Sequence, residues 1–245
     1  MSERENRKRG RRTNNQLKSE MFDALARMVE KQGFNKIPLT AFVKEANIDP
    51  NIFYRHYGTM DRLYEEFVDQ YTFWANDIIT ISDIGKLGYR RFYAEIFKRL
   101  YLELKNNRVM QRLFIWELSE NNFTTRKTTR TREKAHQNWV AYYKDIFKKS
   151  GMDIENITAL ILAGVYYISL NNNTLCSINL SEPYDQSRIL KAIDTFVDLI
   201  FDKLEERQRW QKIIDRMRDD GVSQTKIVEY LGISGIQLKR LTKTK

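Results

Sequence analysis

The sequence predicts an all-α protein, and three observations support this fold class. Proline and glycine are scarce, with 3 and 10 among 245 residues, which favours long helices over a turn-rich β fold. Apolar residues recur at helical spacing, beginning with Leu17, Met21 and Leu25. Small polar residues stand where the expected helices begin, and glycines stand where they end. Hydrophobic residues make up 42% of the chain, which is enough for a sizeable core.

Residues 1–13 are expected to form a flexible arm, because they are rich in arginine and lysine and poor in apolar residues. No apolar run follows this basic start, so a signal peptide is not expected. Arms of this kind can enter the minor groove of DNA beside a helix that lies in the major groove. A first helix is then predicted over residues 14–32, and Gly33 ends it.

Residues 39–63 predict two helices joined by a tight turn. Asn47 tolerates the left-handed backbone that ends a helix abruptly. Asp49 is the expected N-cap of the second helix, and Pro50 is its first residue. The polar and aromatic side chains of this helix suit phosphates and base edges. The residues expected to contact DNA are Arg11, Arg12, Thr40, Pro50, Asn51, Ile52, Tyr54, Arg55 and His56. An ordinary helical hairpin is the alternative.

The segment 14–67 resembles the N-terminal DNA-binding domain of the tetracycline-repressor (TetR) family. The resemblance rests on a first helix that ends in Gly33-Phe34, on the turn with Ile48, and on the run FYRHY over residues 53–57. It implies that the tyrosine and the histidine of that run, Tyr54 and His56, contact phosphates. It also implies that residues early in the same helix approach the bases.

The chain departs from the family pattern at four positions. Asn47 stands where a glycine is usual, and Val43 replaces a small residue at the helix crossing. Pro38 stands where Thr or Ser usually caps the second helix, so this helix must begin differently. Met60 stands where a lysine often contacts phosphate, so that contact is not expected here.

Residues 61–206 are expected to form long helices, at about 60–76, 83–106, 107–121, 127–150, 154–176 and 184–206. The family resemblance implies that this part binds a small effector and dimerises through its last two helices. The apolar residues expected on the self-association face are Ile157, Leu160, Ile161, Gly164, Val165, Ile168, Ile189, Ile193, Phe196, Ile200 and Phe201.

Aromatic residues are frequent in the same segment and could line a pocket for a small apolar or aromatic effector. The candidate pocket residues are Phe92, Phe97, Trp116, Trp139, Tyr143, Tyr166 and Tyr167. A packed aromatic core without a ligand is the alternative.

Residues 207–245 contain a second helix-turn-helix pattern. When Gly232-Ile233-Ser234 is set over Asn47-Ile48-Asp49, Leu238 falls on Phe53. The tail resembles a small three-helix unit of the kind found in transposases and resolvases. Its expected DNA-contacting residues are Gln237, Lys239, Arg240 and Lys243. A tail that docks on its own core or on a partner subunit is the alternative.

The net charge of +10 lies at the two ends of the chain. Residues 1–60 hold 12 Lys and Arg against 7 Asp and Glu, and residues 206–245 hold 10 against 5. The middle of the chain is neutral. This distribution favours double-stranded DNA as a partner, because affinity for DNA depends largely on neutralised phosphates. Basic ends that serve only solubility are the alternative.

Enzymatic motifs are absent from the sequence, which has no glycine-rich phosphate loop, no nucleophile beside a base, and no metal-ligand cluster. We therefore expect no enzyme activity, no cofactor and no metal. A single cysteine excludes a disulfide framework. No apolar run of about 18 residues is present, so we expect a cytoplasmic protein without a membrane span.

The sequence thus predicts four segments: the arm (1–13), a three-helix helix-turn-helix DNA-binding domain (14–60), a helical effector-binding and dimerisation domain (61–206), and a small helical tail (207–245). We expect a homodimeric transcription regulator, most often a repressor in such families, on a palindromic operator. The alternative is an architectural or segregation-type DNA-binding protein that has no effector and uses both basic ends.

Overall fold

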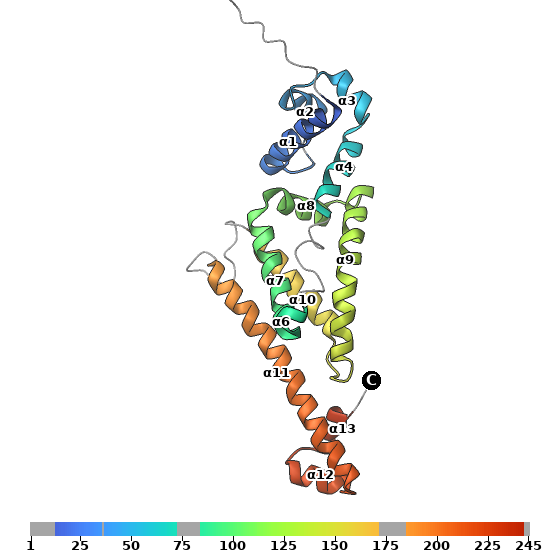
Figure 1. The fold of residues 1–245 in the computed structure, drawn as a ribbon, viewed down its shortest axis with the longest axis vertical. Helices are drawn as coiled ribbons and strands as arrows, with labels where there is room; N and C mark the ends of the chain where they lie inside the picture. The colour runs from blue at the N-terminus through green and yellow to red at the C-terminus, as the bar shows by residue number, and fades with distance from the viewer. Residues whose placement is uncertain (1–12, 36, 73–83, 172–184, 243–245) are drawn as a thin grey trace, which may run out of the picture. The chain divides into compact units, whose positions relative to one another are not determined.

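The computed structural model describes residues 13–35, 37–72, 84–171 and 185–242, and the regular elements within these ranges are α-helices (Figure 1). They are α1 (Asn14–Gln32), α2 (Leu39–Glu45), α3 (Pro50–His56), α4 (Met60–Thr72), α6 (Ile84–Leu87), α7 (Tyr89–Asn106), α8 (Arg108–Ser119), α9 (Phe123–Phe147), α10 (Ile154–Leu170), α11 (Gln186–Asp219), α12 (Gln224–Leu231) and α13 (Gly235–Thr242). The predicted all-α class is confirmed.

The chain divides into two compact units. The first comprises Met1–Phe73 and Asn106–Arg132, and the second comprises Trp74–Lys105 and Glu133–Lys245. The first unit therefore includes α4, α8 and the start of α9, whereas the predicted middle segment begins at residue 61 and includes nearly all of these helices. Helix α11 crosses residue 206 without a break, so the boundary predicted there is not a change in secondary structure.

The first unit is built on α1. Thr13 and Gln16 form a reciprocal capping box at the start of this helix, and Gly33, with φ of 78°, ends it as predicted. The ring of Phe34 then stacks on Trp116 of α8, with centroids 4.6 Å apart. The hydroxyl of Tyr64 on α4 donates a hydrogen bond of 3.0 Å to the carbonyl of Phe34. These contacts join α1, α4 and α8 into one core.

A buried ion pair joins α8 to α9 within the same unit. The Arg132 guanidinium contacts the Glu117 carboxylate, and their side chains are only 11% and 5% exposed. The hydroxyl of Thr128 donates a hydrogen bond to the second oxygen of this carboxylate. The guanidinium also lies 4.1 Å from the centre of the Phe114 ring. Glu117 therefore neutralises a cation that has little access to water.

The second unit has an aromatic core. Tyr93 is fully buried at its centre, with ring centroids 4.5 Å from Tyr143 and 5.6 Å from Phe201. The hydroxyls of both tyrosines have partners, since Tyr93 lies 2.7 Å from the Thr158 hydroxyl and Tyr143 donates to the Tyr89 carbonyl at 2.6 Å. A polar network outside this core joins α7 to α11.

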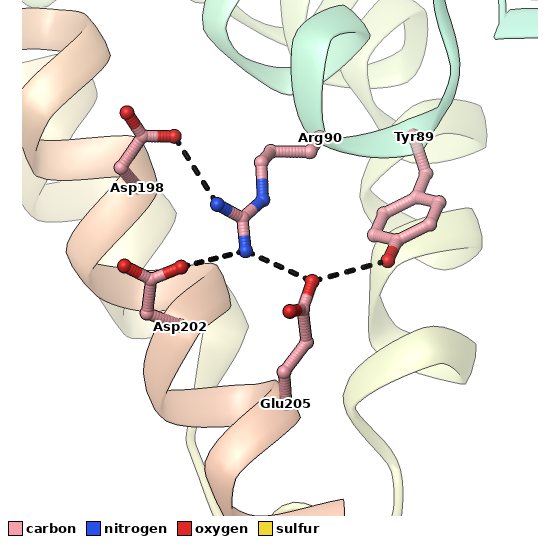
Figure 2. A network of polar contacts seen from close by, with 5 residues as sticks. All are labelled: Tyr89, Arg90, Asp198, Asp202 and Glu205. Carbon is pink, nitrogen blue, oxygen red and sulfur yellow. Dashed lines mark hydrogen bonds and ion pairs between the residues drawn. The ribbon is translucent and has the colours of Figure 1, made fainter.

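Arg90 is the centre of that network (Figure 2). Its guanidinium lies 2.8 Å from Asp202, 2.9 Å from Glu205 and 3.4 Å from Asp198, all on α11. The hydroxyl of Tyr89 donates to the same Glu205 carboxylate at 3.4 Å. Three carboxylates on one helix repel one another, so the single guanidinium stabilises their arrangement on α11 as well as the contact with α7.

Helix α11 ends at Asp219, beyond the segment boundary expected near residue 206. No proline or glycine occurs in its sequence, and Gly221, with φ of 77°, follows shortly after its end. Helices α12 and α13 fold back against the C-terminal end of α11, as Figure 1 shows. Ile214, Ile227 and Leu238, one from each helix, are fully buried in the cluster that they form.

Candidate nucleic-acid interface

The turn between α2 and α3 has the geometry that the sequence predicts. Asn47 adopts a left-handed backbone with φ of 50°, and it is the single non-glycine residue with positive φ in the described part of the chain. The Asp49 side chain accepts a 2.7 Å hydrogen bond from the Asn51 amide, and Pro50 is the first residue of α3. Pro38 precedes α2 without a side-chain cap, as its lack of a hydroxyl requires.

One residue of α3 holds the helix in the first unit. Phe53 is fully buried, and its ring meets Phe42 of α2 edge to face with centroids 5.7 Å apart. Because α3 is only seven residues long, the burial of this ring determines which face remains outside.

The expected DNA-contacting residues lie on the outward face of the α2–turn–α3 segment. Tyr54 is 56% exposed, although large aromatic side chains are usually buried. Ile52 is half-buried. The exposed members of the set are Thr40, Pro50, Asn51, Tyr54, Arg55 and His56. Arg11 and Arg12 lie outside the described residues.

A polar contact that the sequence did not predict fixes the end of α3. The Tyr57 hydroxyl is hydrogen-bonded to the Glu66 carboxylate of α4, and Lys18 of α1 contacts the same carboxylate. Burial and then the nearby Glu66 charge raise the pKa of Tyr57 well above its usual range. Nothing local in the sequence connects Glu66 to Tyr57, which lies nine residues earlier in another helical segment. Glu66 is therefore a positioning residue for the exposed face of α3.

The structure does not gather the predicted effector-pocket residues at one place. Four of them are buried in the second unit: Phe92, Phe97, Trp139 and Tyr143. Their rings pack against one another and against Tyr93, as the alternative of a packed core requires. An open pocket of about 550 Å³ lies elsewhere in this unit, lined by residues that include Lys144, Phe147 and Ile154.

The other three predicted pocket residues lie apart from that core. Trp116 belongs to the first unit, where it stacks on Phe34. Tyr166 is half-buried and Tyr167 is 47% exposed, both on α10. The aromatic content of the middle segment was visible in the sequence, but which rings meet depends on contacts between distant helices.

The expected self-association face is only partly exposed. Leu160 on α10 and Phe196 on α11 are 74% and 52% exposed. Val165, Ile193, Ile200 and Phe201 are buried within the unit, so their placement on that face was wrong. Leu199, which was not among the expected residues, is 63% exposed instead. The exposed face of α11 is therefore rotated about the helix axis from the predicted one, because the aromatic core covers the side of the helix that carries Phe201.

The tail exposes three of its four predicted DNA-contacting residues, Gln237, Lys239 and Arg240, and Lys243 lies outside the described residues. Gln237 also has a structural role, because its side-chain oxygen accepts a 2.7 Å hydrogen bond from the Ser234 amide. The backbone carbonyl of Arg240 accepts a 2.9 Å hydrogen bond from Arg207, which ties α13 to α11 and leaves the Arg240 side chain outside.

Two other kinds of site are not found among the described residues. These residues contain no group of three or more His, Cys, Asp or Glu side chains arranged to hold a metal ion. None of the helices within the described ranges is long and apolar enough to cross a membrane.

No protein-family model and no curated protein match the sequence. Solved structures do match. A protein from Pseudomonas aeruginosa PAO1, described as a putative transcriptional regulator, has a TM-score of 0.56 at 14% identity, over 78% of this chain and 92% of that chain. A protein from Vibrio parahaemolyticus, described as a putative transcriptional regulator of the TetR family, has a TM-score of 0.51 at 14% identity, over 72% of this chain and 96% of that chain. At this identity the likeness establishes the architecture, and the chain has a TetR-like fold.

Proposed function

We propose that the protein is a sequence-specific DNA-binding transcription regulator that acts as a homodimer. The observation that carries this proposal is the exposed face of α3, where Tyr54, Arg55 and His56 project from a short helix held by buried Phe53. Aromatic, cationic and imidazole side chains at the end of a helix suit phosphate contacts, and the amide side chain of Asn51 at its start suits a base edge. The TetR-like fold supports this interpretation.

In the proposed complex each subunit places α3 in a major groove, and a palindromic operator matches the dimer axis. The exposed apolar residues Leu160, Phe196 and Leu199 support self-association through α10 and α11. Repression as the output, and release by a small apolar or aromatic effector, belong to the same proposal. Such an effector would favour a spacing of the two α3 helices that no longer fits the operator.

The proposal is tested with the Tyr54→Ala/His56→Ala variant and a random pool of duplex DNA. Wild-type protein is expected to select a short palindrome. The variant is expected to bind the selected duplex at least about 100-fold more weakly, or ~2.7 kcal/mol, because two side chains that hydrogen-bond to phosphates are removed. Both side chains are exposed, so the variant should keep the wild-type circular dichroism spectrum and oligomeric state.

A matched control truncates two exposed residues at the end of α1, as Lys31→Ala/Gln32→Ala. This control should bind the selected duplex as the wild type does. Equal affinity of wild type and the Tyr54/His56 variant for that duplex would contradict the assignment of α3.

A second candidate function is favoured by one observation. The aromatic core around Tyr93 is filled by its own rings, which supports an architectural or segregation-type DNA-binding protein without an effector. Thermal unfolding in a library of small aromatic compounds distinguishes the two. A ligand that raises the melting temperature and also lowers DNA affinity supports the regulator, since a ligand that binds only the folded state stabilises it.

A further inference from the structure

The tail repeats the turn geometry of the α2–α3 segment. Gly232 adopts a left-handed backbone with φ of 62°, close to the 50° of Asn47. The amide of each of these residues donates to the carbonyl three positions earlier, at 3.2 Å in both turns. The amides of the next residues, Ile233 and Ile48, donate to the carbonyl five positions earlier, at 3.2 and 3.1 Å. Two segments far apart in sequence therefore close the same turn with the same hydrogen bonds.

The agreement extends to the helix after the turn. The Ser234 hydroxyl accepts a 3.1 Å hydrogen bond from the Gln237 amide, so this serine caps α13 as Asp49 caps α3. Leu238 of α13 is fully buried, as is Phe53 at the matching position of α3. The matching helix pairs thus present corresponding faces to their cores and to solvent.

The tail has a core of its own within the second unit. Its three fully buried residues, Ile214, Ile227 and Leu238, come from α11, α12 and α13. The last turns of α11 therefore supply the third helix of this small core. Three helices around one apolar cluster, with a tight turn before the last, form the minimal helix-turn-helix architecture.

The outward face of α13 combines positive charge with an exposed apolar side chain. Lys239 and Arg240 are exposed at the positions that match Tyr54 and Arg55 of α3. Ile236 is 66% exposed at the position that matches Asn51. Lysine and arginine suit phosphates and guanine edges, and an exposed aliphatic side chain suits the methyl group of thymine. This combination fits a DNA groove.

A basic cleft borders the end of α13. It has a volume of about 1010 Å³ and includes Thr242 of α13 in its lining. Four cationic side chains, Lys148, Lys149, Lys212 and Arg218, line it against two carboxylates, Asp145 and Asp215. The excess of positive charge beside the helix favours a polyanion, and a DNA backbone supplies phosphates on both sides of a groove-bound helix.

We propose that residues 214–242 form a second element that binds double-stranded DNA, with α13 in the major groove. Lys239 and Arg240 contact the DNA, Ile236 contacts a base edge, and the basic cleft lies along the phosphate backbone. Gln237 holds the start of α13 through Ser234 and is a positioning residue. This element is additional to α3, and its DNA contacts do not require α3 to bind an operator.

The test measures binding of the full-length protein to a duplex of random sequence, by fluorescence anisotropy at a series of salt concentrations. The Lys239→Ala/Arg240→Ala variant is expected to bind the duplex more weakly than the wild type. The slope of the logarithm of the association constant against the logarithm of the salt concentration is negative, and its magnitude is expected to fall by roughly 1.8, about 0.9 for each phosphate that the protein no longer neutralises. Arg126→Ala/Arg130→Ala removes two exposed charges from α9 and is expected to leave the slope unchanged.

Two further variants separate folding and the role of α3 from this proposal. Lys239→Arg/Arg240→Lys keeps both charges and is expected to keep the wild-type slope. Adding Lys239→Ala/Arg240→Ala to Tyr54→Ala/His56→Ala is expected to remove the binding that the latter variant retains. If Tyr54→Ala/His56→Ala alone binds as the wild type does, the function proposed for α3 fails and the proposal for the tail does not.

An unchanged salt slope in Lys239→Ala/Arg240→Ala overturns the proposal for the tail, and leaves that for α3 intact. If the same variant also shows a changed sedimentation coefficient while its salt slope is unchanged, the proposal for the tail is likewise overturned, because the tail would then contact the partner subunit and not DNA.

Discussion

Removing the Glu117 carboxylate is expected to destabilise the first unit strongly. In Glu117→Ala, the Arg132 guanidinium keeps its place between α8 and α9, where its side chain is 11% exposed, but loses its buried counter-ion. Thr128, which is fully buried, loses one of the two acceptors of its hydroxyl and keeps the Thr125 carbonyl at 3.0 Å. Breaking one partner of a buried pair typically costs about 3–5 kcal/mol, because the remaining charge is left in a poorly solvated site.

The expected loss is large relative to the whole stability of a domain, which is roughly 5–15 kcal/mol. It can be measured by urea unfolding followed by circular dichroism at 222 nm. Glu117→Met/Arg132→Met removes both charges and is expected to recover most of the loss, because apolar replacement of a buried pair is often close to neutral. The interaction between the guanidinium and Phe114 is absent from this double variant, so recovery need not be complete.

Glu45→Ala is the matched control, because Glu45 forms a 2.9 Å pair with Arg27 at the surface of the same unit. Exposed pairs contribute little, since water already solvates both charges. The reasoning is refuted if Glu117→Ala is no more destabilising than Glu45→Ala, or if the double methionine variant is as unstable as Glu117→Ala.

Two further predictions concern pH and salt. Burial raises the pKa of Tyr64 to about 12, with a further contribution from Asp61, so the folded state favours the neutral phenol. The contribution of this residue to the free energy of unfolding is therefore complete below pH 10 and is lost as the pH rises from 10 to 12. In urea unfolding, the free energy of unfolding should decline more steeply above pH 10 in the wild type than in Tyr64→Phe. Arg90→Ala should lower the free energy of unfolding by roughly 1 kcal/mol, since this change removes three partly exposed ion pairs. Repeating that measurement in 1 M NaCl should shrink the difference between wild type and variant, and a difference independent of salt would contradict an electrostatic role.

The features predicted correctly from the sequence depend on residues close together in the chain. Asn47 adopts positive φ, Asp49 caps α3, and Gly232 repeats the turn, because each outcome follows from local backbone sterics and a side chain within three residues. The exposure of Tyr54 agrees with the phosphate contact that the family resemblance implies for this residue.

The features that were missed depend on contacts between distant segments. Trp116 could be assigned to a helix from the sequence, but its stacking on Phe34 could not, and this contact places it away from the other predicted pocket residues. Glu66 has the sequence context of ordinary surface charge, and only the folded chain brings Lys18 and Tyr57 to it. Phe201 was assigned to an outer face because periodicity identifies an apolar stripe without saying which neighbour covers it.

The length of helix α11 also determines the direction in which the tail points around the helix axis. Phe196 on its outer face and Ile214 under the tail lie 18 residues apart in one unbroken helix. At about 3.6 residues per turn this separation is close to five whole turns, so both side chains leave the helix on the same side. Removing one residue between them would turn the tail by about 100° around the axis, whereas removing seven would return it to within about 20°. The length of this helix, counted in single residues, therefore determines the direction in which each proposed dimer points its second pair of DNA-binding elements.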